Sequence, residues 1–268
     1  LSKAAGLRPD AFVPDMEDSV AWDDKDEARQ VVADHIETLN QSGKPVIPRL
    51  NSLDTGLFQK DLEAVAQTGI YGISVGKINS EKDVGLISEA IKEQESKYGI
   101  EHGSLKLIPW IETAKGLLRC YEILTSDRRI IAAAFGAEDF TNDMGMIWTP
   151  EENELYHARA TISLASRAAG LDPPIDTVFI DLHDNEHLKK SAETALGLGY
   201  RGKLCIHPSP PQLGRGAAAA HGGRLALQPA RERVEQRDAQ LAAVRGGQAG
   251  EGHALPLPAS HCCNAYAC

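Results

Sequence analysis

The sequence lacks any apolar run of the roughly 18 residues that a membrane-spanning helix needs, and its mean hydropathy is −0.28. It also lacks an excess of positive charge, because 28 Lys and Arg stand against 38 Asp and Glu, a formal net charge of −10. Proteins that act on nucleic acids usually carry the opposite balance. We therefore expect no membrane and no nucleic-acid partner, and any anionic ligand must be met by local positive charge.

Cysteine is scarce and odd in number. Of five cysteines, only Cys120 and Cys205 lie in the well-patterned part of the chain, each in apolar surroundings, which favours a reducing compartment. The sequence begins at Leu1 without an initiator Met or an apolar targeting segment, so we expect the true N-terminus to lie upstream. The expected location is the cytoplasm, or the mitochondrial matrix if an upstream targeting segment is missing.

Between residues 10 and 208 the sequence alternates short apolar runs with amphipathic stretches, which is typical of alternating strands and helices. Seven strands are predicted, at 10–17, 46–51, 72–78, 105–112, 130–139, 175–181 and 202–208. Six helices are predicted, at 23–41, 54–68, 80–97, 113–126, 151–169 and 184–199, with Asp54, Ser80, Thr113 and Asp184 among the N-caps.

Seven parallel strands at spacings of about 25–35 residues favour a closed barrel over an open doubly wound sheet. The sequence also lacks the Gly-x-Gly-x-x-Gly and Walker segments of nucleotide-binding sheets. The predicted fold class is α/β, a (β/α)₈ TIM barrel that lacks its first strand, which chain upstream would supply. This domain is predicted to span residues 1–213.

Residues 214–268 differ from the rest in composition, with no Lys, Ile or Phe but 14 Ala, 8 Gly and 6 Arg. Helix formers are concentrated at about 224–245, where Pro229 would have to open a helix. We expect an atypical tail that is partly helical and otherwise disordered. A linker, an unrelated tail and a shifted reading frame are all compatible with this composition.

Charged or polar side chains follow every predicted strand, at the end where barrel active sites form. They are Asp15, Glu17 and Asp18 after the first strand, Arg49 and Asn51 after the second, Lys77 after the third, Glu112 after the fourth, Glu138 and Asp139 after the fifth, Asp181 after the sixth and His207 after the seventh.

Glu112 and Asp139 close consecutive strands, and neighbouring strands lie about 4.8 Å apart, so the two carboxylates can share one divalent cation. Oxygen ligands without a nearby His or Cys pair favour Mg²⁺, or Mn²⁺, over Zn²⁺. In the alternative interpretation, Glu112 caps the following helix and Asp139 lies in a solvated loop. Residue pattern alone does not separate the two.

Arg49 can grip a substrate carboxylate with its two-pronged guanidinium, or it can form an ion pair with Asp18 or Glu17. For Asp15, Glu17 and Asp18, salt bridges to Arg49 and Lys77 are favoured over a role around the waters of a metal. Structural roles are also favoured for three other candidates: Lys77, His207 as a turn residue, and Cys120 in the core.

Five segments in order resemble the citrate lyase β-subunit-like proteins of the metal-dependent CoA-thioester lyase and HpcH/HpaI aldolase group. They are KAAGLRPDAFVPDMEDSVAWDDKDEAR (3–29), VIPRLNS (46–52), LIPWIETAKGL (107–117), FGAEDFTNDMG (135–145) and GKLCIHP (202–208). The resemblance covers about residues 3–210. It implies a (β/α)₈ barrel, a homotrimer, Mg²⁺, and cleavage or formation of 3-hydroxyacyl-CoA thioesters of the citryl-, citramalyl- or malyl-CoA kind.

By the same resemblance, Arg49 grips the substrate carboxylate and thioester, and Glu112 and Asp139 are the metal ligands and act in catalysis, with Glu112 also touching substrate. Lys3, Ile206 and His207 mark the side that receives CoA. The family's Asp-x-Pro-like motif, whose Asp serves a neighbouring subunit, has no match here, since Asp238 lies in a helical pattern with no Pro after it. Two alternatives are a metal-dependent aldolase for free 2-oxo acids and a barrel that binds ligand without turnover.

Overall fold

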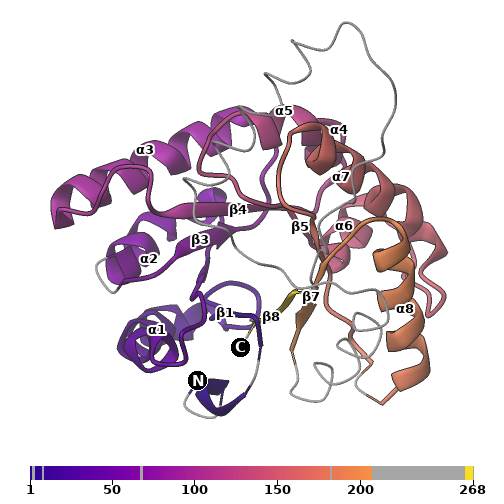
Figure 1. The fold of residues 1–268 in the computed structure, drawn as a ribbon, viewed down its shortest axis with the longest axis horizontal. Helices are drawn as coiled ribbons and strands as arrows, with labels where there is room; N and C mark the ends of the chain where they lie inside the picture. The colour runs from indigo at the N-terminus through magenta and orange to yellow at the C-terminus, as the bar shows by residue number, and fades with distance from the viewer. Residues whose placement is uncertain (2–3, 8, 67–68, 182, 207–262, 268) are drawn as a thin grey trace, which may run out of the picture.

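The computed structural model describes residues 1, 4–7, 9–66, 69–181, 183–206 and 263–267 (Figure 1). Its strands are β1 (Ala11–Val13), β2 (Arg49–Leu50), β3 (Gly72–Val75), β4 (Lys106–Ile111), β5 (Ala134–Phe135), β6 (Ile175–Asp176), β7 (Gly202–Cys205) and β8 (Cys263–Ala267). Its α-helices are α1 (Lys25–Asn40), α2 (Phe58–Val65), α3 (Glu81–Tyr98), α4 (Ala114–Leu118), α5 (Cys120–Thr125), α6 (Ala137–Met144), α7 (Tyr156–Ala168) and α8 (Asn185–Gly197). None of these helices is long and apolar enough to cross a membrane.

All strand pairs in the sheet are parallel, in the order β1-β8-β7-β6-β5-β4-β3-β2. The two edges of this sheet meet, because parallel bridges pair Phe12 with Val46 and Asp15 with Arg49. Backbone hydrogen bonds reinforce the junction, including one from the Arg49 N–H to the Pro14 carbonyl at 2.8 Å. The α/β fold is therefore a curved parallel sheet with helices on its outer side, as Figure 1 shows.

Strand β8 corrects the prediction for the tail. It pairs Ala265 with Ala11 of β1 and Cys263 with Gly202 of β7. The eighth strand was expected upstream of Leu1, but in the structure it comes from the tail. Without β8, the backbone groups on the facing edges of β1 and β7 would have no strand partner. Five residues of CNAYA carry too weak a pattern to be recognised as a strand. The rest of the tail, with the helix expected at 224–245, lies outside the described residues.

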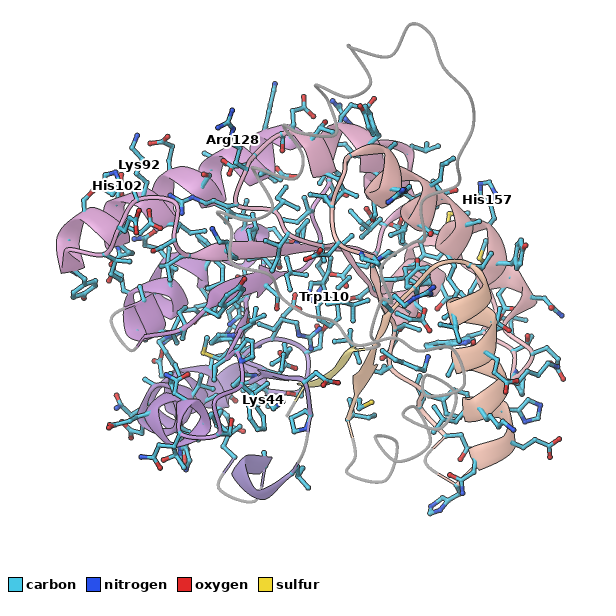
Figure 2. The ribbon with its side chains drawn as sticks, in the orientation of Figure 1. Lys44, Lys92, His102, Trp110, Arg128 and His157 are labelled. Atoms are coloured by element: carbon cyan, nitrogen blue, oxygen red, sulfur yellow. The ribbon has the colours of Figure 1, made fainter. Side chains whose placement is uncertain are left out.

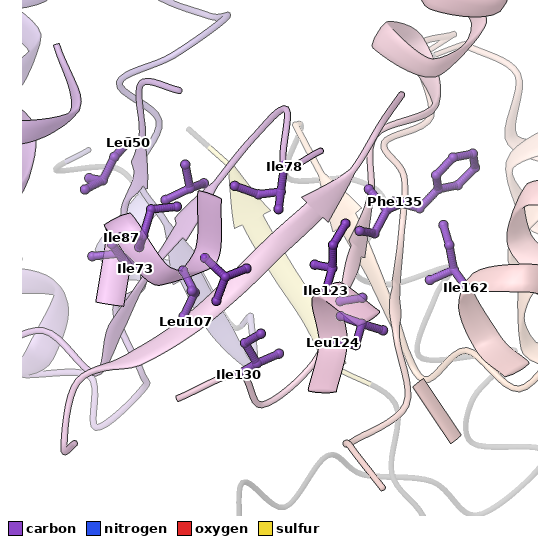
Figure 3. Packing of buried hydrophobic residues seen from close by; sticks show 14 of the residues in the cluster. Leu50, Ile73, Ile78, Ile87, Leu107, Ile123, Leu124, Ile130, Phe135 and Ile162 are labelled. Atoms are coloured by element: carbon purple, nitrogen blue, oxygen red, sulfur yellow. The ribbon is translucent and has the colours of Figure 1, made fainter. Parts of the chain in front are cut away.

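Apolar side chains form two layers, which β4 separates by the alternation of its residues. Leu107 and Ile111 belong to the large cluster between the sheet and the helices, part of which Figure 3 shows. Ile108 and Trp110 belong to a second cluster with Val13 and residues from β5, β6 and β7. Trp110 accordingly lies near the middle of the ring of strands in Figure 2. The sheet thus has a filled interior, and the site forms where its strands end.

The predicted strand at 130–139 is too long at its carboxyl end. Strand β5 stops at Phe135, and α6 begins at Ala137, directly after Gly136. Glu138 and Asp139 therefore lie in the first turn of a helix, where carboxylates are favoured by the helix dipole. The apolar run through Ala134 and Phe135 masked this short helix in the sequence.

Candidate active site

Lys77 lies at the centre of a group of carboxylates just beyond the end of β3. Its Nζ is 3.0 Å from Oε1 of Glu17, 3.4 Å from Oδ1 of Asp18 and 3.3 Å from Oδ2 of Asp139. Its backbone N–H donates to Oε1 of Glu112 at 2.6 Å. The φ angle of Lys77 is +56°, a conformation uncommon for a residue with a side chain. One residue thus links carboxylates from three separate parts of the sheet's edge.

Arg49 is the second cation of the site and is held on several sides. Its Nε and Nη2 donate to the two carboxylate oxygens of Asp15 at 2.7 and 2.5 Å, and its Nη1 donates to Asp18 at 3.1 Å and lies 3.3 Å from Glu17. The guanidinium carbon lies 4.6 Å from the centre of the Trp110 ring. Burial would lower the pKa of Arg49, but Asp15 and the other carboxylates raise it overall. Arg49 is therefore a fixed positive charge.

These contacts confirm that Asp15, Glu17 and Asp18 form salt bridges with Arg49 and Lys77. Asp15 is buried, and its pKa is lowered because hydrogen bonds and charge from Arg49 outweigh the opposing effect of burial. Burial and the nearby Asp18 raise the pKa of Glu17 in spite of Arg49 and Lys77. Of the three, Asp18 is the exposed one, with about half of its side chain open to solvent.

Glu112 is a buried carboxylate at the end of β4, with 1% of its surface exposed. The alternative that Glu112 caps the next helix is wrong, because Thr113 is the N-cap of α4 and its side chain accepts from the Gly116 N–H. Burial raises the pKa of Glu112 to about 8, with further contributions from the negative charges of Glu17 and Asp139. Glu112 is thus a carboxylate whose charge is poorly compensated by its surroundings.

Asp139 reaches the same group of residues from α6. About 31% of its side chain is exposed, and its Oδ2 faces Nζ of Lys77. The alternative of a solvated loop residue therefore does not describe it. Glu138, its neighbour in sequence, is exposed to solvent. Asp139 and Glu112 both contact Lys77, one through the ammonium group and the other through the backbone.

We call these seven side chains the charged cluster; its members are Asp15, Glu17, Asp18, Arg49, Lys77, Glu112 and Asp139. Five carboxylates against two cations give the cluster a formal charge of −3. In addition, the buried Oε2 of Glu17 accepts no hydrogen bond among the described residues, and its nearest cation is Nη1 of Arg49 at 3.3 Å. Both observations fit a cluster that takes up one more cation.

A divalent metal fits the donor set of this cluster. Mg²⁺ is usually bound by one or two carboxylates, with waters and substrate completing its shell, and Glu112 and Asp139 are the two carboxylates that would hold it. In the part of the chain that the structure describes, no three His, Cys, Asp or Glu side chains form a ready set of metal ligands. The expected arrangement is therefore an open one, in which the protein contributes two ligands.

The other residues predicted for the site are not among the contacts described above. Asn51 is buried and donates to Asp61 at 2.6 Å, a structural role. Asp181 is exposed and accepts from the His183 N–H, since β6 already ends at Asp176. Ile206 is 45% exposed directly after β7. Lys3 and His207 lie outside the described residues.

A polar pocket of about 210 Å³ opens beside Lys77. Ligand pockets usually measure about 300–1,000 Å³, so this one is smaller than most. Two lysines and two carboxylates stand in its wall; the lining residues are Leu53, Asp54, Gly76, Lys77, Ile78, Asn79, Asp83 and Lys115.

Sequence reasoning missed three residues that shape the site. A Cβ atom on Gly76 would lie 2.5 Å from Oε1 of Glu112, and one on Gly136 would overlap the same carboxylate. The two glycines therefore make the space that Glu112 fills. Trp110 supports Arg49 through its ring. The signal available in the sequence was the position of each glycine directly after a strand, next to a charged segment.

The chain is similar in sequence to proteins of one family. Residues 1–208 match the family model described as HpcH/HpaI aldolase/citrate lyase. The citrate lyase subunit β of Leuconostoc mesenteroides subsp. cremoris is 33% identical over 207 residues, covering 77% of this chain and 68% of the relative. The mitochondrial citramalyl-CoA lyase of Mus musculus is 30% identical over 219 residues, covering 78% and 64%.

Solved structures agree as well. The citrate lyase β subunit of M. tuberculosis, complexed with oxaloacetate and magnesium, is 28% identical with a TM-score of 0.63, covering 81% of this chain and 89% of the other. A Haloferax volcanii malate synthase shares the fold at a TM-score of 0.72 and 22% identity, covering 85% and 70%. On the family match and these relatives, the chain belongs to the HpcH/HpaI aldolase/citrate lyase family.

Proposed function

We propose that this protein is a Mg²⁺-dependent lyase that cleaves or forms a 3-hydroxyacyl-CoA thioester of the citryl-, citramalyl- or malyl-CoA kind. Cleavage would give acetyl-CoA and a 2-oxo acid. The observation that carries the proposal is the charged cluster, which has an excess of negative charge. In it, buried Glu112 and partly exposed Asp139 both contact Lys77. The family and the names of its members support a lyase that breaks a carbon–carbon bond.

Glu112 and Asp139 would hold the Mg²⁺, and Mn²⁺ would meet the same oxygens. When bound, the metal would polarise the oxygens of the oxo acid as a Lewis acid. A relative solved with oxaloacetate and magnesium supports this pairing of metal and acid. Burial keeps Glu112 out of bulk water, so its interaction with a cation is stronger than in solvent.

Cleavage leaves negative charge on both fragments, and Arg49 is the fixed cation placed to offset it. Its contacts with Asp15 and Trp110 hold the guanidinium in position before any ligand arrives. A preorganised donor that meets charge developing on the substrate is worth about 3 kcal/mol in a transition state. Its Nη1 faces Asp18, the exposed partner. A substrate carboxylate or thioester oxygen could therefore replace Asp18 at Nη1 without breaking the buried pair with Asp15.

The proposal extends to CoA binding, the completeness of the barrel, the oligomeric state and the location of the protein. We place CoA on the side of Lys3, Ile206 and His207, of which Ile206 is exposed at the end of β7. We take the eight strands to form a complete (β/α)₈ barrel and the protein to be a homotrimer, which light scattering on the purified protein would test. The cytoplasm or the mitochondrial matrix remains the proposed location, and a mitochondrial relative supports the second.

The direct test is to incubate the purified protein with Mg²⁺ and citryl-, citramalyl- or malyl-CoA and to follow acetyl-CoA and the 2-oxo acid by mass spectrometry. We expect both products in equal amounts with at least one thioester, and their loss on chelation of the metal. Asp139→Asn is the inactive comparison, and Glu138→Gln is a matched control, because Glu138 is its exposed neighbour. Absence of acetyl-CoA from all three substrates would overturn the proposal.

A metal-dependent aldolase that acts on free 2-oxo acids is the second candidate. The small polar pocket beside Lys77 favours it, because its volume suits an acid without a CoA moiety. The two candidates differ in how they respond to CoA. If acetyl-CoA raises the melting temperature in the presence of Mg²⁺, the lyase is favoured; if only the oxo acid does, the aldolase is.

A further inference from the structure

Lys77 occupies the position that a bound cation would compete for. We propose that Lys77 is a built-in counter-cation that competes with the divalent metal for Asp139, and so sets the metal affinity of the site. The inference rests on the proposed function for the metal itself, but it assigns to Lys77 a positioning role that is separate from ligating the metal.

The distances indicate an ammonium group shared among several partners. Nζ lies 3.0 to 3.4 Å from Glu17, Asp139 and Asp18, whereas a dedicated charge-assisted hydrogen bond is about 2.7–2.9 Å long. Glu17 accepts an ordinary hydrogen bond from Nζ, while Asp139 and Asp18 lie farther away. Such a shared ammonium can be exchanged for another cation more easily than the buried, bidentate guanidinium of Arg49.

The backbone of Lys77 is held by two hydrogen bonds, whereas its ammonium is shared among three carboxylates. The N–H donates to Glu112 at 2.6 Å, and the carbonyl accepts from Nδ2 of Asn79 at 2.9 Å. The side chain is 31% exposed on a flexible four-carbon stem. The polar pocket beside it carries Asp54 and Asp83. An ammonium displaced by a metal thus has carboxylates within the neighbouring pocket to turn toward.

The positive charge of Lys77 determines whether it strengthens or weakens metal binding. In the metal-free protein Lys77 offsets the repulsion among Glu17, Asp18 and Asp139, and those carboxylates in turn raise the pKa of Lys77 although burial opposes this. A divalent cation that arrives must displace the ammonium or remain beside a like charge. Either way Lys77 weakens metal binding while it stabilises the metal-free protein.

The test uses Lys77→Met, which keeps the unbranched stem and removes the charge. Titration calorimetry should give a dissociation constant for Mg²⁺ that is lower than in the unaltered protein by about tenfold or more, from the loss of a nearby positive charge. The melting temperature of the metal-free variant should fall, and saturating Mg²⁺ should bring it close to that of the unaltered protein. Lys82→Met is the matched control, since Lys82 is exposed on α3 and its loss changes the net charge equally.

Lys77→Arg keeps the positive charge and should show no gain in Mg²⁺ affinity. If Lys77→Met binds Mg²⁺ no tighter than the unaltered protein, Lys77 is a structural residue and the inference is overturned, while the proposed function stands. If the unaltered protein binds no Mg²⁺ and neither does the variant, the metal proposal fails and the inference fails with it.

A second measurement needs no variant that might fail to fold. In the unaltered protein, acetylation of lysines at mild alkaline pH is mapped by mass spectrometry with and without Mg²⁺. Displacement of the ammonium should raise the reactivity of Lys77 relative to Lys82. Unchanged or lower reactivity of Lys77 at saturating Mg²⁺ would contradict competition.

Discussion

The backbone N–H of Lys77 donates a 2.6 Å hydrogen bond to Oε1 of Glu112, which ties the chain beyond β3 to the end of β4. The bond orients Glu112 toward the charged cluster and away from α4, whose N-cap is Thr113. The ammonium group of Lys77 forms an ion pair with Asp139. The position of both carboxylates therefore depends on one residue between them and on the space around Glu112.

Gly136→Ala tests whether the space beside Glu112 is needed for metal binding. The new Cβ would overlap the Glu112 carboxylate, so Glu112 must shift, and we expect Mg²⁺ affinity to fall by about tenfold or more, as for other changes that misorient a ligand. No charge is altered. Calorimetry with Mg²⁺ measures the effect.

Gly85→Ala is the control for that variant. Gly85 lies on α3 with nothing within 4 Å of an added Cβ, so Ala should stabilise the helix by about 0.5–1 kcal/mol and leave Mg²⁺ affinity unchanged. Equal Mg²⁺ affinity in both variants would show that Glu112 is not a metal ligand.

Arg49→Lys tests the fixed cation. Lysine keeps the charge but cannot make the two-pronged contact with Asp15, so we expect a loss of about 2 kcal/mol, or about 4–8 °C in melting temperature. Binding of the oxo acid should weaken as well. Arg128→Lys, at an exposed position, is the control in the same thermal melts. An unchanged melting temperature with intact oxo-acid binding would exclude both roles of Arg49.

A buried ion pair away from the site predicts a dependence of stability on pH. Asp176 accepts from Nε of Arg159 at 2.8 Å and from Nζ of Lys203 at 2.7 Å. Burial would raise the pKa of Asp176, but these two cations hold it below its ordinary value. Because the folded pKa is lower than the unfolded value of about 3.9, the stability from this group is complete above about pH 4 and is lost as pH falls through the folded pKa.

Asp176→Asn should therefore destabilise the protein by about 3–5 kcal/mol at pH 7, because it removes the carboxylate that pairs with buried Lys203 and leaves Arg159 paired with Glu152 alone. Thermal melts between pH 7 and pH 3 should show the difference from the unaltered protein shrinking toward the acid end. Asp181→Asn, at an exposed acid, should have little effect at any pH. A difference that stays constant down to pH 3 would contradict the lowered pKa of Asp176.

Local signals in the sequence were sufficient for much of the fold. All seven predicted strands are present. Short apolar runs bounded by Gly, Asp or Pro indicate strands even when the neighbouring strands in the sheet are unknown. Thr113 and Asp184 cap α4 and α8 through their side chains as expected. Ser80 takes the N-cap position of α3 without a side-chain bond, and Asp54 lies instead in a short 3₁₀ turn.

Long-range contacts explain what the sequence did not predict. The central place of Lys77 depends on a φ of +56° and on the approach of two glycines to Glu112; each glycine follows a strand in the sequence, but its contact with Glu112 is set by a distant part of the chain. Strand β8 is recognised by its pairing with β1 on one side and β7 on the other, and not by a pattern in its own residues. The pairing of Arg49 with Asp15 follows from the bridge that joins the two edges of the sheet.

The central claim is that Glu112 and Asp139 bind a divalent metal together. The most direct measurement is calorimetric titration of Mg²⁺ into the unaltered protein and into Asp139→Asn, with Glu138→Gln as the control from the same turn of α6. We expect one Mg²⁺ per chain for the unaltered protein and for Glu138→Gln, and a loss of most of that affinity in Asp139→Asn. Equal Mg²⁺ affinity in all three proteins would contradict the central claim.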